Sequence, residues 1–247
     1  IDEELKMKTI LEIARRETFL FFDSLIAYVL LAVFLGFSGF FTWLYGSDVF
    51  FSGQASLRSF FTAAYWILFL FIPALTMRTI SEEKKTGTLE LLLTKPVTDW
   101  QVVAGKYLSV MILVTVALIL TLPYYFTVWV LGNIDHGATL LGYFGLILMS
   151  SALAGIGIFM SSLTNNQIVA FISSLIAGIF FILVFDVVAQ QMSGAVGVVI
   201  NYISMTGHFD SISRGVLDTR DLVYFLSVTF LGLFLASSSL SKRNIID

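Results

Sequence analysis

The sequence predicts an all-α integral membrane protein with six transmembrane helices. Hydrophobic residues make up 57% of the chain and charged residues only 13%, a balance unlike that of an ordinary soluble domain. Charges are also absent from several windows of about 20 residues or more, the length that a helix needs to cross a bilayer. A backbone inside the bilayer must pair with itself, and unbroken apolar runs such as 26–35 exclude the alternation of barrel strands.

Five charge-free windows place the spans. Four windows fit one crossing each, whereas the window 137–185 is too long for one helix and contains a polar break at Thr164, Asn165, Asn166 and Gln167. This window therefore predicts a helical hairpin. We expect a single transmembrane domain, 24–241, with spans at about 24–47, 59–77, 102–131, 140–163, 168–185 and 222–241, and a cytoplasmic tail, 242–247.

The distribution of cations predicts the orientation. With six spans and the N-terminus inside, eleven of the fourteen Lys and Arg residues face the cytoplasm, as the positive-inside rule expects. We expect a multi-pass protein of the inner (cytoplasmic) membrane with both termini in the cytoplasm. The inner cations are Lys6, Lys8, Arg15, Arg16, Arg78, Lys84, Lys85, Lys95, Lys106, Lys242 and Arg243, and the outer ones are Arg58, Arg214 and Arg220.

Residues 1–23 predict a leader followed by an amphipathic helix. Met7, Ile10, Leu11 and Ala14 repeat at helical spacing, with charged residues on the opposite face. We expect this helix to lie along the inner membrane surface, and the alternative is a cytoplasmic helix packed on a partner. Residues before Met7 are expected to be unstructured. A secretory signal peptide is not expected, because this charged stretch precedes a full-length span.

Local signals shape the third and fourth spans. Thr98 and Gln101 predict a capping box at the start of the third span, and Pro123 predicts a kink within it. The fourth span is rich in small residues, so another helix is expected to approach it closely. The sequence leaves open whether that contact is within the chain or between two copies. The small residues are Ser151, Ala154, Gly155, Gly157, Ser161 and Ser162.

The connection between the second and third spans, 78–97, contains the candidate functional site. Leu89, Leu92 and Leu93 fall on one face of a short amphipathic helix, which Gly87 and Pro96 delimit. This apolar face requires a partner.

The sequence lacks motifs for nucleotide binding, metal binding or catalysis. The nearest approach to a phosphate-binding loop, Gly105-Lys106, lacks both the first glycine and the hydroxyl residue of that motif. The chain has no cysteine, and its two histidines, His136 and His208, have no metal-ligand spacing. We therefore expect no catalytic residue, no cofactor, no metal and no enzymatic activity in this chain.

The stretch from Glu82 to Val97 resembles the loop between the second and third spans of ABC-2 type permeases, and most closely the gliding-motility branch of that family. A second stretch, from His208 to Asp218 and on to Tyr224, resembles the same branch before its last span. The resemblance implies a coupling helix that sits in a groove of a separate ATPase. The coupling residues it implies are Glu82, Glu83, Gly87, Thr88, Leu89, Glu90, Leu92, Leu93 and Pro96.

The same resemblance implies the remaining partners. The first is a cytoplasmic ABC ATPase, expected as a dimer, which binds the ATP. The second is another permease chain, either identical or related, and an accessory membrane protein is a further option. No nucleic acid is expected as a partner. The segment 187–219 would form short outer helices between spans 5 and 6, and export is implied by analogy. The alternative function is a membrane anchor or scaffold that recruits an ATPase or assembly partner without transport. An ion-coupled carrier is disfavoured, because the core windows contain no charge.

Overall fold

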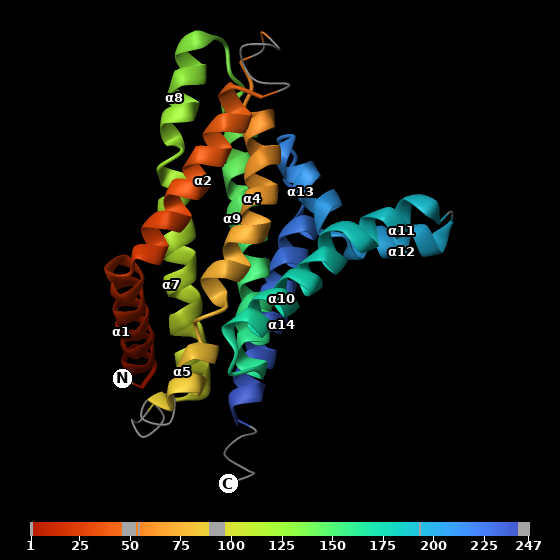
Figure 1. Cartoon of the computed structure of the whole chain (residues 1–247). Helices are drawn as coiled ribbons and strands as arrows, with labels where there is room; N and C mark the ends of the chain where they lie inside the picture. The colour runs from red at the N-terminus through yellow and green to blue at the C-terminus, as the bar shows by residue number, and fades with distance from the viewer. Residues whose placement is uncertain (1, 46–52, 54, 89–96, 193, 242–247) are drawn as a thin grey trace.

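The structure, a computed structural model, describes residues 2–45, 53, 55–88, 97–192 and 194–241. Every regular element in these ranges is helical, and six helical segments are long and apolar enough to cross a membrane (Figure 1). The predicted fold class is thereby confirmed. The six segments are Leu25–Trp43, Arg58–Thr86, Asp99–Leu131, His136–Leu163, Gln167–Gln191 and Thr219–Ser241.

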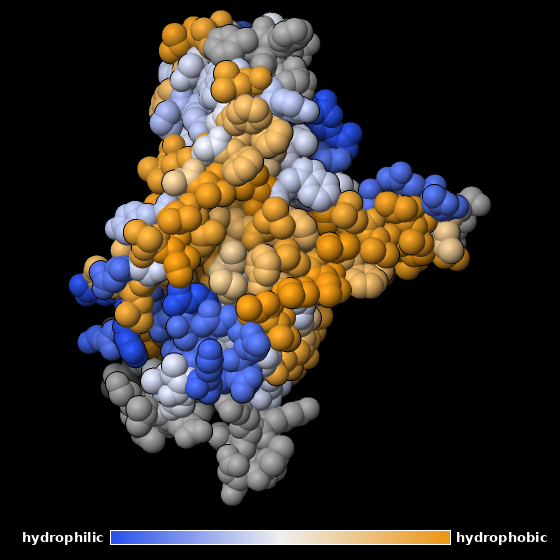
Figure 2. Space-filling view, viewed as in Figure 1, coloured by the Kyte–Doolittle hydropathy of each residue, from blue (hydrophilic) through white to orange (hydrophobic). Residues whose placement is uncertain are grey.

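The spans form an elongated bundle with two distinct ends (Figure 1). We call the end with the N-terminus, α5 and the C-terminal end of α14 the basal end, and the opposite end the distal end. A charged patch covers the basal end on one face, directly below a broad apolar belt over α2 (Figure 2). This order matches a protein whose belt lies in lipid and whose basal end lies in water.

Helix α1 (Asp2–Asp23) packs lengthwise against the basal half of α7 (Figure 1). The expectation of an unstructured leader was wrong, because the helix already begins at Asp2. Ala14 is buried at 2% exposure, but Met7 and Leu11 are 58% and 55% exposed. The predicted apolar face is thus split between contact with α7 and the surface, and the placement of α1 at the membrane surface stays a prediction.

The first two spans cross next to each other. Helix α2 (Leu25–Trp43) begins at Ser24, whose side chain accepts a hydrogen bond from the N–H of Ile26. It packs on α4 (Arg58–Thr76), and Phe34 of α2 and Phe60 of α4 are both fully buried. A short helix, α5 (Ser81–Thr86), follows α4 at the basal end.

The third span consists of α7 (Asp99–Ile119) and α8 (Leu122–Leu131). The capping box of Thr98 and Gln101 is present in full at the start of α7. The helix breaks at 120–121, and Pro123 lies in the first turn of α8, where its missing N–H costs no hydrogen bond. The capping box is confirmed, and the span is interrupted as expected, but at 120–121, before Pro123, and not at the proline itself.

Helix α9 (His136–Leu163) occupies the centre of the bundle. In its apolar window 78% of the residues are buried, against 28% for α14 (Thr219–Ser241). An added Cβ on Gly232 of α14 would lie 2.5 Å from the carbonyl carbon of Gly155, so the two backbones touch. The close contact that the small residues predicted is therefore made within the chain.

The predicted hairpin is confirmed, with α9 followed after three residues by α10 (Gln167–Ile179), which Asn166 caps. The fifth span extends through a π-helical turn, η1 (Phe180–Val184), into α11 (Phe185–Gln191), beyond its expected end at 185. Short helices α12 (Ala195–Ile203) and α13 (Met205–Ser213) follow. Helices α11 and α12 form an arm that projects sideways from the bundle, and α13 returns to α9 (Figure 1).

Candidate functional site at the basal corner

A sharp corner joins α4 to α5, and α9 holds it in place. The hydroxyl of Ser161, near the end of α9, accepts hydrogen bonds from the backbone N–H groups of Ile80 (3.2 Å) and Ser81 (3.1 Å). The same hydroxyl donates to the carbonyl of Met77 (3.1 Å). Since Ile80 is also fully buried, the corner is fixed to the fourth span.

Two charged side chains tie α5 to its neighbours. The guanidinium of Arg78 binds Glu82 in a fork, with Nε to Oε2 at 2.8 Å and Nη2 to Oε1 at 3.1 Å. The Nζ of Lys84 donates to the carbonyl of Ser162 in α9. Gly87 ends α5 at a φ of +71°, a left-handed conformation that side chains disfavour, so glycine is needed where the chain leaves the helix.

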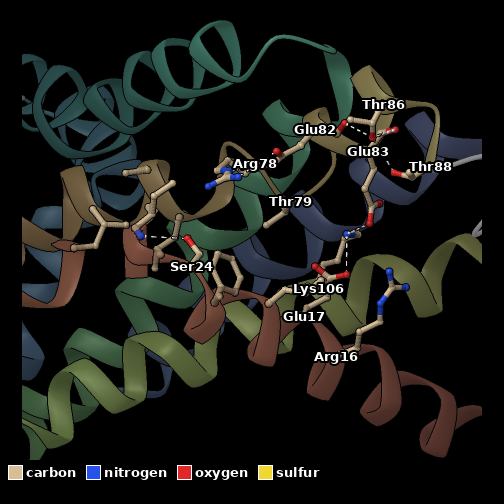
Figure 3. A pocket seen from close by; sticks show the side chains of 16 residues that line it. Arg16, Glu17, Ser24, Arg78, Thr79, Glu82, Glu83, Thr86, Thr88 and Lys106 are labelled. Carbon is tan, nitrogen blue, oxygen red and sulfur yellow. Dashed lines mark hydrogen bonds and ion pairs between the residues drawn. The ribbon is translucent and has the colours of Figure 1, made fainter. Parts of the chain in front are cut away.

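A buried charge cluster fastens α5 to two further helices. Lys106 of α7 is only 1% exposed, and its Nζ lies 2.8 Å from Oε1 of Glu83 in α5 and 3.4 Å from Oε1 of Glu17 in α1 (Figure 3). We call Glu17, Glu83 and Lys106 the Lys106 node. A buried ammonium loses its hydration, so the two carboxylates are what makes its burial tolerable. The node therefore holds α1, α5 and the third span in one arrangement.

The sequence analysis placed Lys106 among the cations that face the cytoplasm and gave it no partner. A signal was present, because Val103 and Val110 are three residues before and four after it, and both are fully buried. Helical spacing thus puts Lys106 on the buried face of α7. Glu17 could not be found in this way, since it belongs to a helix 89 positions earlier in the chain.

Four of the predicted coupling residues are described by the structure and lie together at the basal corner. Glu82 and Glu83 are in the first turn of α5, and Gly87 and Thr88 follow its end. The Oγ1 of Thr88 lies 2.9 Å from the Oγ1 of Thr86. The other predicted coupling residues, Leu89, Glu90, Leu92, Leu93 and Pro96, lie outside the described residues.

A cavity of about 420 Å³ lies next to the node, between α1, α2, α4, α5 and α7 (Figure 3). This volume is within the range of about 300–1,000 Å³ that is usual for small-molecule sites. One part of its wall is charged or hydroxylic and the other part is apolar. The lining residues are Arg16, Glu17, Leu20, Phe21, Ser24, Ile26, Leu30, Ala74, Leu75, Arg78, Thr79, Glu82, Glu83, Thr86, Thr88 and Lys106.

A second polar cluster lies near the distal end, between α13 and α14. His208 Nδ1 lies 2.6 Å from Oδ1 of Asp221, and Nε2 lies 3.1 Å from the carbonyl oxygen of Tyr202. The imidazole also stacks on the ring of Tyr224 at 4.2 Å. The sequence analysis found no metal-ligand spacing around His208 and gave it no partner, so this pairing was missed. Asp218 caps α14 next to this cluster, since its Oδ1 accepts a hydrogen bond from the N–H of Arg220.

Neither cluster has the composition of a metal site. In the described part of the chain, no three His, Asp or Glu residues lie close enough together to hold a metal ion.

The chain has six apolar spans with a charged corner at their basal end, and this arrangement defines it as a multi-pass membrane protein. The sequence pattern of the ABC-2 family transporter protein matches residues 41–237, which is most of the chain. The chain therefore belongs to the ABC-2 family of transporter proteins, and the family part of the predicted resemblance is confirmed.

Two curated relatives match the chain. They are the "Probable multidrug ABC transporter permease YbhR" of Escherichia coli strain K12 and the protein of the same name from Escherichia coli O157:H7. Each is 30% identical over 150 residues, which cover 57% of this chain and 38% of the relative. The chain thus spans well under half the length of the curated relatives that it matches.

Proposed function

We propose that this chain is the permease subunit of an ABC transporter and couples ATP hydrolysis by a separate ATPase to substrate movement. The observation that carries this proposal is the Lys106 node together with the Ser161 contacts. They attach α5, which leads directly into the predicted coupling segment, to three other helices. A membrane anchor would need a surface for a partner but no such linkage.

The proposed mechanism is mechanical. ATP binding draws two ATPase subunits together and displaces the segment 87–96 that is docked on each of them. Because α5 is bonded to α7 and α1 through the node, and to α9 through Ser161, its displacement moves these helices with it. The spans then change between inward-open and outward-open arrangements.

The finer assignments belong to the same proposal. The two sequence stretches around α5 and α13 support a place in the gliding-motility branch, which implies export by analogy, and the name of the curated relatives supports a transporter permease. The cation distribution supports an inner-membrane location with both termini in the cytoplasm. A second permease chain, identical or related, would complete the pathway.

Docking of the ATPase can be tested by co-purification. Leu92→Asp should lose the ATPase from the purified complex, because a charge would enter the apolar docking face. Leu11→Asp is the matched control, since Leu11 is an exposed leucine of α1 outside the segment, and it should keep the ATPase. An ATPase that remains bound to the Leu92→Asp variant would refute the docking assignment.

Coupling is tested separately with a triple variant, Glu17→Gln, Glu83→Gln and Lys106→Met, which removes every charge of the node. We expect this variant to retain the ATPase but to lose the stimulation of ATP hydrolysis by transport substrates in liposomes. Normal stimulation would show that the node is a structural contact only and would favour coupling through the α9 contacts.

A further inference from the structure

The cavity beside the node combines two kinds of surface that amphiphiles require. The helices that line it contribute both charged and apolar side chains. On the surface, the charged basal patch lies directly below the apolar belt (Figure 2). The charged part holds three cations, Arg16, Arg78 and Lys106, and three carboxylates, Glu17, Glu82 and Glu83. The apolar part consists of Leu20, Phe21, Ile26, Leu30, Ala74 and Leu75. The charged wall is therefore neutral in sum, which suits a ligand head that carries both signs.

Most of these charges already have partners. Arg78 is bound in a fork by Glu82, and Lys106 is shared between Glu17 and Oε1 of Glu83. Within the described residues, two groups on the wall remain without a partner. The Oε2 atom of Glu83 is buried and accepts no hydrogen bond, and the exposed guanidinium of Arg16 makes no ion pair. A buried carboxylate oxygen without a donor costs free energy. Because Oε2 has almost no accessible surface, a ligand reaches it only when the Glu83 carboxylate turns toward the cavity, and a hydrogen bond donated to it then offsets that cost.

From this arrangement we propose that the cavity binds a phospholipid from the basal leaflet whose head joins a phosphate to a primary ammonium, as in phosphatidylethanolamine. Arg16 contacts the phosphate, and Oε2 of Glu83 accepts an N–H bond from the ammonium. Both side chains are among those that line the cavity (Figure 3). The start of an acyl chain lies against the apolar lining residues, which are Leu20 and Phe21 of α1, Ile26 and Leu30 of α2, and Ala74 and Leu75 of α4.

The charge pattern of the cavity favours an ethanolamine head group over the other common phospholipid head groups. A choline head has the same two charges but no N–H, so it leaves Oε2 of Glu83 unpaired. An anionic head such as phosphatidylglycerol brings no cation to the carboxylates. This binding proposal does not depend on the proposed coupling function, because it concerns occupancy of the cavity and can hold in a protein that transports nothing.

Native mass spectrometry of the full chain, purified with its copurifying subunits, tests the proposal. The protein is titrated with phosphatidylethanolamine, phosphatidylcholine and phosphatidylglycerol of identical acyl chains. We expect phosphatidylethanolamine to bind about tenfold more tightly than the other two, the ratio that one charge-assisted hydrogen bond provides. Equal affinity for phosphatidylethanolamine and phosphatidylcholine, or tighter binding of phosphatidylglycerol, would overturn the assignment of Glu83.

Two variants locate the binding. Arg16→Gln should weaken phosphatidylethanolamine binding about tenfold, whereas Arg15→Gln, a change of the adjacent exposed arginine that does not line the cavity, should leave it unchanged. Ala74→Phe should fill the apolar part of the cavity and reduce binding independently of charge. If both arginine variants behave alike and Ala74→Phe retains the lipid, the bound lipid is annular and the proposed site is wrong.

Discussion

Lys106 is a buried cation shared by two carboxylates, and this arrangement makes each member dependent on the others. The ammonium is 1% exposed, and the carboxylates of Glu17 and Glu83 are 13% and 18% exposed. The node holds one cation against two anions, so removing the lysine leaves two carboxylates without their cation, whereas removing all three charges leaves none uncompensated. Loss of the node would therefore loosen the contacts among α1, α5 and α7 together.

Lys106→Met is expected to destabilise the protein by about 3–5 kcal/mol, because it leaves Glu17 and Glu83 facing each other without their cation. Thermal unfolding of the purified protein in nanodiscs measures the effect. The triple variant with Glu17→Gln and Glu83→Gln should recover most of the loss. A triple variant no more stable than Lys106→Met alone would show that packing of the lysine stem, and not charge, holds the node.

The His208 and Asp221 pair at the distal end follows the same rule. His208→Leu should cost about 3 kcal/mol, because it strands a carboxylate that is only 8% exposed and whose Oδ2 already has no partner among the described residues. Asp221→Asn should cost about 1 kcal/mol, since the amide oxygen can still accept from the imidazole. Unfolding midpoints of the two variants provide the comparison, and the reverse order would contradict a charged Asp221.

Among the elements, the contact of α9 with α14 depends on the small size of its glycines. An added Cβ on Gly155 would lie 2.9 Å from the carbonyl oxygen of Thr229, and one on Gly232 would meet Gly155 at 2.5 Å. These are backbone atoms, so no side-chain rotation relieves the clash. Close backbone packing of this kind is how helices gain contact in a bilayer, where apolar side chains have no preference for each other over lipid.

Gly232→Ala should therefore separate α14 from α9 and lower stability by about 1–3 kcal/mol. Gly36→Ala is the matched control, because a Cβ there meets nothing within 4 Å and the helix of α2 favours alanine over glycine by about 0.5–1 kcal/mol. Unfolding in nanodiscs should show opposite signs for the two substitutions. Equal effects would mean that the interface can relax without cost.

The elements themselves follow closely from local sequence. The capping box at Thr98, the break before Pro123 and the turn at Asn166 each depend on residues a few positions apart, and all appear where the sequence placed them. The fifth span does not end at 185, where the sequence placed its end, because the helix continues through η1 to Gln191. No glycine or proline occurs between Phe185 and Gln191, so hydropathy marked the end of the apolar run and not the end of the helix.

Across the whole molecule, the absence of cysteine makes orientation directly testable. Lys85→Cys at the basal end and Arg214→Cys near the distal end would each introduce a single exposed thiol. We expect a membrane-impermeant maleimide to label Arg214→Cys in intact cells, and to label Lys85→Cys only after the membrane is broken. The opposite pattern would reverse the proposed orientation and place the coupling segment outside.

The sequence by itself determined that this is a six-span helical membrane protein, where the third and fifth spans start, and which segment resembles a coupling loop. These properties depend on runs and spacings within about 30 residues, which a bilayer and the helix geometry constrain strongly. Only the tertiary structure decided that Lys106 joins Glu17 to Glu83, that Gly155 meets Gly232, and that α11 and α12 form a lateral arm. Such contacts depend on which helices pack against each other, and the local sequence of each helix does not predict its neighbours.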